Sequence, residues 1–209
     1  MLDDILTLAR QLSVPVRELG RAKLASLART DGHQGVIATA SSLRPDDLDD
    51  LLVEQGGVAP FLLAADGVTD PGNLGALLRT AECAGVTGIV LPRHRAVHVS
   101  PAVTKAAAGA VEHLRFALVG GLPTALSHLS DAGVLVVGLD MDGDTSIHDL
   151  PPLDGPVTVV VGSEGRGLRR LVRQRCDVVA SIPLLGATES LNVSVAGAIA
   201  LYEVVRRRS

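Results

Sequence analysis

From Pro60 onward, short uninterrupted apolar runs alternate with segments that have the apolar spacing of helices. A strand that is apolar at every position is typical of a parallel sheet covered on both faces. We therefore predict an α/β domain over residues 60–209, with helices on both faces of a mostly parallel sheet. Such sheets bind ligands at the carboxyl ends of their strands. The expected strands are 61–65, 87–91, 114–119, 134–139, 157–162 and 178–183, and the expected helices are 73–84, 101–113, 123–129, 168–175 and 191–207.

The residues before Pro60 are less regular. Segments 3–12 and 21–28 have helical spacing, 14–18 is interpreted as a short extended segment, and 35–40 is a predicted strand. We predict that residues 1–40 form part of a small α/β domain, because they are too few to close a core alone. Residues 41–59 contain Pro45, an acidic run and a Gly-Gly pair, and they are the predicted linker.

Composition narrows how this chain could bind a partner. Apolar residues make up 47% of its 209 residues, so a buried core is expected and disorder is not. The chain has no Trp, and its aromatic residues are Tyr202, Phe61 and Phe116, so stacking on nucleic-acid bases is nearly excluded. The net charge of −4 hides basic clusters at 166–175 and 206–208, which we interpret as solvated helix faces or as a local basic surface.

The cysteines and the apolar runs indicate a cellular compartment. Cys83 and Cys176 lie in apolar helical patterns without CxxC spacing, so we predict buried free thiols in a reducing environment. No apolar run reaches the roughly 20 residues of a membrane span, and Met1–Asp4 is unlike the start of a signal peptide. The prediction is a cytoplasmic protein with no membrane partner.

The first of three loops that could form a functional site covers residues 66–80. It leads from a strand into a helix, where Asn73 is a plausible N-cap and Arg79 follows six residues later. Neither GxGxxG nor GxxxxGK[ST] is present, so these nucleotide-binding loops are excluded. On spacing alone, a structural turn and a ligand site remain equally open.

The second and third loops are more specific. In the second, Gly162, Gly165 and Gly167 allow close backbone approach to a ligand, although a plain turn with Glu164 exposed is the alternative. In the third, residues 182–197, we expect Ser190 to cap a helix. Asn192 needs a hydrogen-bond partner if it is buried, either local or in a ligand or network.

Two other site types find little support. A hydrolase with Ser163 or Ser190 as nucleophile would need a partner histidine, yet no GxSxG elbow exists and none of the three loops contains His. His94 and His98 have metal-ligand spacing, but no carboxylate or cysteine motif accompanies them. We interpret them as a surface pair and predict no metal.

Together, the three loops resemble the three signature motifs of the SpoU (TrmH-like) branch of the SPOUT methyltransferases. Residues 100–110 also resemble a family segment, and the likeness extends from about 61 to 207. The matching residues are Asp70, Pro71, Asn73, Gly75, Arg79 and Thr80; Gly162 to Gly165; and Ser190 to Ala196.

This resemblance implies a fold and a cofactor. The expected fold has a deep C-terminal trefoil knot, and the expected assembly is a homodimer. The implied cofactor is S-adenosyl-L-methionine (AdoMet), contacted by backbone groups of Gly162, Ile182 and Leu191, with Leu139 and Gly138 as weaker candidates.

The resemblance also implies a reaction, the methylation of an RNA ribose 2′-hydroxyl. Its expected catalytic residues are Arg79, Asn73, Glu164, Ser190 and Asn192. Because arginine is effectively always protonated, we expect Arg79 to orient ribose and phosphate rather than to act as a base.

Residues 1–40 resemble the end of an L30e-like RNA-recognition domain found in family members that act on ribosomal RNA, most clearly at His33-Gln34-Gly35-Val36. This favours 23S rRNA over tRNA as the substrate. The alternatives are a tRNA 2′-O-methyltransferase and a non-catalytic RNA-binding protein of this fold. The latter would be expected to lack Arg79, Glu164 or Asn192, and all three are present.

Overall fold

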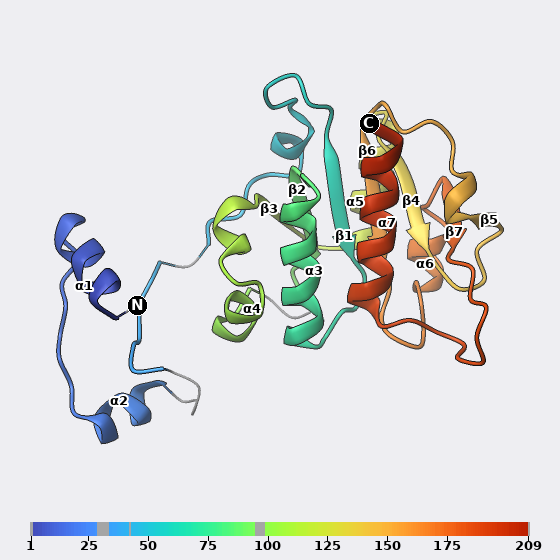
Figure 1. Cartoon of the computed structure of the whole chain (residues 1–209). Helices are drawn as coiled ribbons and strands as arrows, with labels where there is room; N and C mark the ends of the chain where they lie inside the picture. Colours follow the sequence, from blue (N-terminus) through green and yellow to red (C-terminus); the bar gives the residue numbers. More distant parts are fainter. Residues whose placement is uncertain (1, 29–33, 42, 95–98, 209) are drawn as a thin grey trace. The chain divides into compact units, whose positions relative to one another are not determined.

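The computed structural model describes residues 2–28, 34–41, 43–94 and 99–208. The chain divides into two compact units, Met1–Ser42 and Leu43–Ser209 (Figure 1). The first unit contains α1 (Leu2–Gln11) and α2 (Arg21–Ala28), so both predicted helices are confirmed. None of its described residues is buried. The predicted strand at 35–40 is wrong, because the described residues of this unit offer no strand for it to pair with.

The second unit is built on a seven-stranded sheet in which every neighbouring pair is parallel. The order is β3-β2-β1-β6-β4-β7-β5, which confirms the predicted α/β class. Each predicted strand is found within about two residues of its expected bounds. The strands are β1 (Phe61–Ala65), β2 (Gly88–Pro92), β3 (Phe116–Val119), β4 (Leu135–Leu139), β5 (Thr145–Ser146), β6 (Val157–Val161) and β7 (Val178–Ser181).

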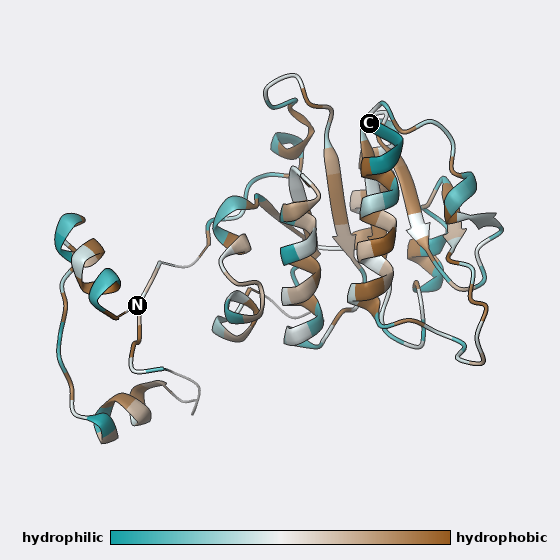
Figure 2. Cartoon of the chain, in the orientation of Figure 1, coloured by the Kyte–Doolittle hydropathy of each residue, from teal (hydrophilic) through white to brown (hydrophobic). Residues whose placement is uncertain are grey.

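Helices cover both faces of this sheet (Figure 1). On one face lie α3 (Pro71–Cys83), α4 (Pro101–Ala106) and α7 (Val193–Arg208), and on the other lie α5 (Leu122–Asp131) and α6 (Arg170–Arg173). Alternate strand residues enter the two cores, as Leu63 and Leu62 of β1 do. Figure 2 accordingly shows strands that are hydrophobic along their length.

Segment 43–59, which lies within the predicted linker, packs as part of the second unit. The amide of Asp46 donates to the Phe116 carbonyl at 2.7 Å beside β3, and Arg115 bonds the Asp46 carboxylate at 2.9 Å. The segment includes the 3₁₀ helix η1 (Asp49–Leu52), whose Leu51 is 2% exposed. The acidic run therefore has a structural role at the edge of the sheet.

The helix predicted over 101–113 is interrupted. It ends at Ala106, the chain turns through positive φ at Ala108 (51°) and Gly109 (93°), and the 3₁₀ helix η2 (Ala110–His113) follows. A third 3₁₀ helix, η3 (Ile147–Asp149), lies beside the short strand β5. The trefoil knot stays a prediction.

Candidate functional site

The three predicted loops meet at the carboxyl edge of the sheet. They follow β1, β6 and β7; β1 pairs directly with β6, and β4 lies between β6 and β7. Their common edge contains a pocket that encloses about 610 Å³, open solvent at its mouth included.

Six of the ten predicted site residues line this pocket: Leu139, Gly162, Glu164, Ile182, Ser190 and Leu191. The lining also includes Asp140, Met141, Ser163, Gly165, Gly167, Ala180 and Val193, which were not among the predicted site residues. Most of these residues adjoin predicted positions in the sequence, so the predicted strand ends located the pocket correctly. Gly138, Asn73, Arg79 and Asn192 do not line it.

The loop after β6 exposes backbone groups to the pocket. Its glycines, which have no side chain to cover the backbone, are required by the close packing and the positive φ angles of the loop. Ser163 and Gly167 exchange two backbone hydrogen bonds of 3.0 Å, which close residues 163–167 into a tight turn. A Cβ on Gly162 would lie 2.2 Å from the carbonyl carbon of Gly167, which no side chain tolerates. Gly165 and Gly167 have φ of 73° and 61°, a region that favours glycine.

Two carboxylates hold this loop against the sheet. Asp66, fully buried at the end of β1, accepts from the Arg169 amide at 2.9 Å and from Arg169 Nε at 2.7 Å. Asp140, after β4, accepts from the Leu168 amide at 3.1 Å and pairs with Arg173 at 3.0 Å. Sequence reasoning missed both anchors, although each is an aspartate directly after an expected strand.

Gly138 has a packing function. A Cβ there would lie 2.6 Å from Cys176 Sγ and 2.7 Å from Leu168 Cδ1, so its open side faces α6. Burial raises the pKa of the Cys176 thiol to about 12. The expectation that both cysteines are buried is wrong, because Cys83 is exposed on α3 and Cys176 is only partly buried.

A continuous chain of hydrogen bonds joins the three loops. Asn73 Nδ2 donates to Glu164 Oε2 at 3.2 Å, and Asn192 Nδ2 donates to Asn73 Oδ1 at 2.8 Å. Asn192 Oδ1 in turn accepts from the Ser194 amide at 2.9 Å and from the Ser194 hydroxyl at 2.6 Å. The partner that we expected for Asn192 is therefore a network.

The helix caps explain why the side chains of Asn73 and Asn192 can take part in this network. Asp70 is the N-cap of α3, where its carboxylate accepts from the Asn73 amide at 2.7 Å, so the predicted cap at Asn73 is wrong. At α7 the cap is Asn192, whose side-chain oxygen bonds the amide two residues on, and the expected cap at Ser190 is wrong too. Because Asp70 caps α3, the Asn73 side chain is free to cross to the other loops.

Arg79 lies apart from this network. It is six residues after Asn73 on α3, about 9 Å along the axis and roughly 120° around it. Its side chain is exposed and has no hydrogen bond or ion pair with any residue that the structure describes. Within one chain, the predicted catalytic arginine therefore stays outside the pocket.

The structure gives no support to the other site types. Over the described ranges, no three or more His, Cys, Asp or Glu side chains gather where a metal could bind, and His98 of the predicted surface pair lies outside those ranges. Neither Ser163 nor Ser190 bonds a histidine in the part of the chain that the structure describes. No helix among the described residues has the length and apolar character of a membrane span.

Comparison with known proteins identifies the same family that the three motifs resemble. Residues 60–202 match the SpoU rRNA methylase family, and residues 1–46 match the family "RNA 2′-O ribose methyltransferase substrate binding".

Similar proteins include the 23S rRNA (guanosine-2′-O-)-methyltransferases RlmB of Shewanella oneidensis, 41% identical over 99% of this chain and 84% of that protein, and of Ralstonia nicotianae, 43% identical over 100% and 83%. The crystal structure of AdoMet-bound rRNA methyltransferase from Sinorhizobium meliloti has a TM-score of 0.75 and 26% identity, and it covers 90% of this chain and 70% of that one. The resemblance of the motifs is therefore confirmed, and the chain belongs to the SpoU rRNA methylase family.

Proposed function

We propose that this protein transfers a methyl group from AdoMet to the ribose 2′-hydroxyl of a guanosine in 23S rRNA. The observation that carries this is the glycine-lined pocket at the sheet edge, whose rim is joined by the Glu164–Asn73–Asn192 chain of hydrogen bonds. The RlmB relatives support rRNA as the substrate, and the substrate-binding match over residues 1–46 supports an RNA substrate. A reaction on ribosomal RNA places the enzyme in the cytoplasm.

The lining of the pocket fits AdoMet in its chemistry. Its walls are apolar at Leu139, Val161, Ala180, Ile182 and Leu191, while the glycines leave backbone groups open to a ligand. Because a Cβ at Gly162 would force the Gly167 backbone aside, the sequence keeps this space free. Backbone groups of Gly162, Ile182 and Leu191 would hold the cofactor. When bound, the cofactor supplies a methyl group activated by its sulfonium.

The polar residues at the rim would position the ribose. Glu164 keeps one carboxylate oxygen bonded to Asn73, which leaves the other for a hydroxyl of the substrate. Ser190 lines the pocket and offers a hydroxyl that can donate or accept. Holding a nucleophile in line with its target supplies a large share of a transfer rate, so these residues act by placement.

Arg79 would enter the site from a second copy of the chain. Two observations support a homodimer: Arg79 is exposed and does not line its own pocket, and α7 exposes apolar side chains on one face. Val195 is 47% and Tyr202 is 49% exposed, seven residues apart on the same side of the helix. A second copy packed there would bury these side chains and bring its arginine to the substrate. Arg79 then orients ribose and phosphate, as a permanent cation with a planar fork of donors can.

Labelled AdoMet with separate 23S rRNA and tRNA pools tests the reaction. We expect label on a guanosine ribose of 23S rRNA, mapped by nuclease digestion and mass spectrometry. For Arg79→Ala we expect methylation to be lost while the Kd for AdoMet changes less than about threefold. Label confined to tRNA would overturn the choice of substrate, and label in protein alone would overturn the reaction.

Mixed dimers test the origin of the arginine. Arg79→Ala and Asn192→Ala chains are each expected to be inactive, and co-refolding them should restore part of the activity, because one site of the hybrid then has an intact pocket and an intact arginine. Turnover by Arg79→Ala alone would contradict the role of the arginine. Failure of the hybrid dimers to recover activity would contradict its supply by the partner.

A further inference from the structure

Folding leaves a distinct subset of arginines unpaired in the second unit. Most of its arginines bond carboxylates or carbonyl groups: Arg93, Arg115, Arg169, Arg173, Arg206, Arg207 and Arg208. Among the described residues of the second unit, five exposed arginines have side chains without a hydrogen bond or ion pair: Arg44, Arg79, Arg166, Arg170 and Arg175. Three of these five lie within ten residues of each other, directly after β6.

The arginines of the 166–175 segment have two kinds of role. Arg169 and Arg173 bind Asp66 and Asp140, at the ends of β1 and β4, so these two charges are neutralised and fix α6 across the sheet edge. Arg166, Arg170 and Arg175 have no such partner and remain exposed. A segment that needed arginine only for folding would not require these three.

Arg166 lies at the mouth of the pocket. Its neighbours Gly165 and Gly167 both line the pocket, and the Ser163–Gly167 bonds hold this turn closed. The carboxylates on either side of the segment have donors of their own. Glu164 accepts from Asn73, and Asp177 accepts from the Val136 amide at 2.8 Å and from Ser130 at 3.1 Å. The three cations are therefore available to an external anion.

We propose that Arg166, Arg170 and Arg175 form a phosphate-binding strip that holds the RNA backbone beside the pocket. This inference rests on the proposed function. Guanidinium groups bind phosphates bidentately, and a chain with no Trp and three other aromatic residues cannot grip RNA mainly by stacking. Most of the affinity must then come from charge, which gives binding that weakens steeply with salt.

The test compares variants that each remove positive charge. Arg166→Gln is paired with Arg93→Gln, an exposed arginine directly after β2 whose guanidinium donates to the Leu118 carbonyl at 3.2 Å. The triple variant Arg166→Gln/Arg170→Gln/Arg175→Gln removes the whole strip. Binding of transcribed 23S rRNA is followed over a series of KCl concentrations, with the Kd for AdoMet and the KM for rRNA measured on the same preparations.

We expect the magnitude of the negative slope of log K against log[KCl] to decrease by about 2 in the triple variant and by about 0.7 in Arg166→Gln. The KM for rRNA should rise at least tenfold in the triple variant, while the Kd for AdoMet, which depends on the intact fold, stays within twofold. Arg93→Gln should match the unmodified protein. An unchanged slope and KM in the triple variant, or equal losses in Arg93→Gln and Arg166→Gln, would refute the strip.

These outcomes separate the strip from the proposed function. If the unmodified protein methylates rRNA and the triple variant behaves identically, the function stands and the strip is refuted. If the unmodified protein methylates no RNA but the triple variant loses the salt-dependent binding, the strip is supported as an RNA contact and the proposed reaction fails.

Discussion

Asn73 connects the three loops because its amide group both donates and accepts. Its nitrogen bonds Glu164, and its oxygen receives the Asn192 amide. A serine or a carboxylate at this position could not make both bonds in the same geometry. The residue that joins the three motifs stands outside the pocket, and in the proposed reaction it would act on the substrate through Glu164.

Asn73→Asp tests this link selectively. The aspartate can still accept from Asn192, but it places a carboxylate against that of Glu164 and removes the donor. We expect kcat for rRNA to fall roughly 100-fold, because a displaced positioning group costs about that much, while the Kd for AdoMet is nearly unchanged. The loss relative to the unmodified protein should shrink as the pH falls, since two adjacent carboxylates share a proton more readily.

The double variant Asn73→Asp/Glu164→Gln serves as the control. Its glutamine amide can donate to the aspartate, so the hydrogen bond is restored with its direction reversed. Thermal unfolding should then return toward that of the unmodified protein. A single variant with full kcat at neutral pH would show that Asn73 has only a structural role.

At the scale of elements, helix α6 fixes one wall of the pocket. It has only four residues, and it is held by Asp66 and Asp140 from two different strand ends. So short a helix has little stability of its own. The position of the 162–168 loop therefore depends on these two carboxylates.

Replacing Asp66 by Asn should loosen this wall. The amide cannot compensate the Arg169 charge and offers one acceptor where two oxygens now accept. We expect the free energy of unfolding to fall by about 1–3 kcal/mol and the Kd for AdoMet to rise about tenfold, measured by urea unfolding and calorimetry. Asp177→Asn, which removes a charge from an exposed aspartate bonded to β4, is the control and should leave the Kd for AdoMet unchanged. If both variants and the unmodified protein have equal Kd values for AdoMet, then the Asp66 anchor does not contribute to cofactor binding.

The strands were predictable from sequence, whereas several helix ends were not. An apolar run such as 157–162 has one favourable environment, the middle of a covered parallel sheet. The end of α4 instead depends on a tertiary contact. A Cβ on Gly75 of α3 would lie 2.3 Å from the Ala106 Cβ, so the two helices cross closely there. No local sequence pattern predicts the left-handed backbone conformation of Ala108, which follows the end of α4.

The site was predictable as a set of strand ends, and its internal bonds were not. Glycines around Glu164 indicated a ligand-facing turn, and the structure places that turn at the pocket. The bond between Asn73 and Asn192 joins residues 119 positions apart. Such a pairing depends on which strands become neighbours, and the periodicity of the sequence does not determine the strand order.

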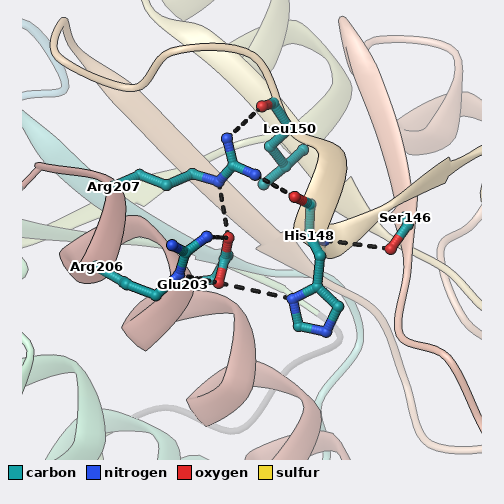
Figure 3. A network of polar contacts seen from close by, with 6 residues as sticks. All are labelled: Ser146, His148, Leu150, Glu203, Arg206 and Arg207. Atoms are coloured by element: carbon teal, nitrogen blue, oxygen red, sulfur yellow. Dashed lines mark hydrogen bonds and ion pairs between the residues drawn. The ribbon is translucent and has the colours of Figure 1, made fainter.

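At the scale of the whole molecule, the terminal arginines hold the second unit together. Arg207 donates to the carbonyl groups of Leu150 and His148, and Arg208 donates to those of Leu153 and Pro60 (Figure 3 shows the Arg207 contacts). The end of α7 is thereby tied to the segment after η3 and to the entry of β1. At least two of the three terminal arginines are therefore structural, so the local basic surface considered from the sequence is not made by this cluster as a whole.

Glu203 is the centre of this connection, since it is 6% exposed and bonds both Arg206 and Arg207 (Figure 3). Hydrogen bonds from Arg206, and then from Arg207, lower the pKa of Glu203 from 4.5 to about 2. A carboxylate whose pKa is lowered by folding stabilises the protein above its unfolded pKa, and this contribution is lost as the pH falls through the folded value.

Glu203→Gln should therefore lower the free energy of unfolding by about 2 kcal/mol at pH 7. The deficit relative to the unmodified protein should shrink between pH 4.5 and about 2, because the unmodified protein loses this contribution there. Urea unfolding of both proteins at several pH values measures the difference. Glu112→Gln removes the same charge from an exposed site and should change stability by less than about 0.5 kcal/mol. A deficit that stays constant down to pH 2 would show that packing, and not the ionised carboxylate, is what Glu203 contributes to the fold.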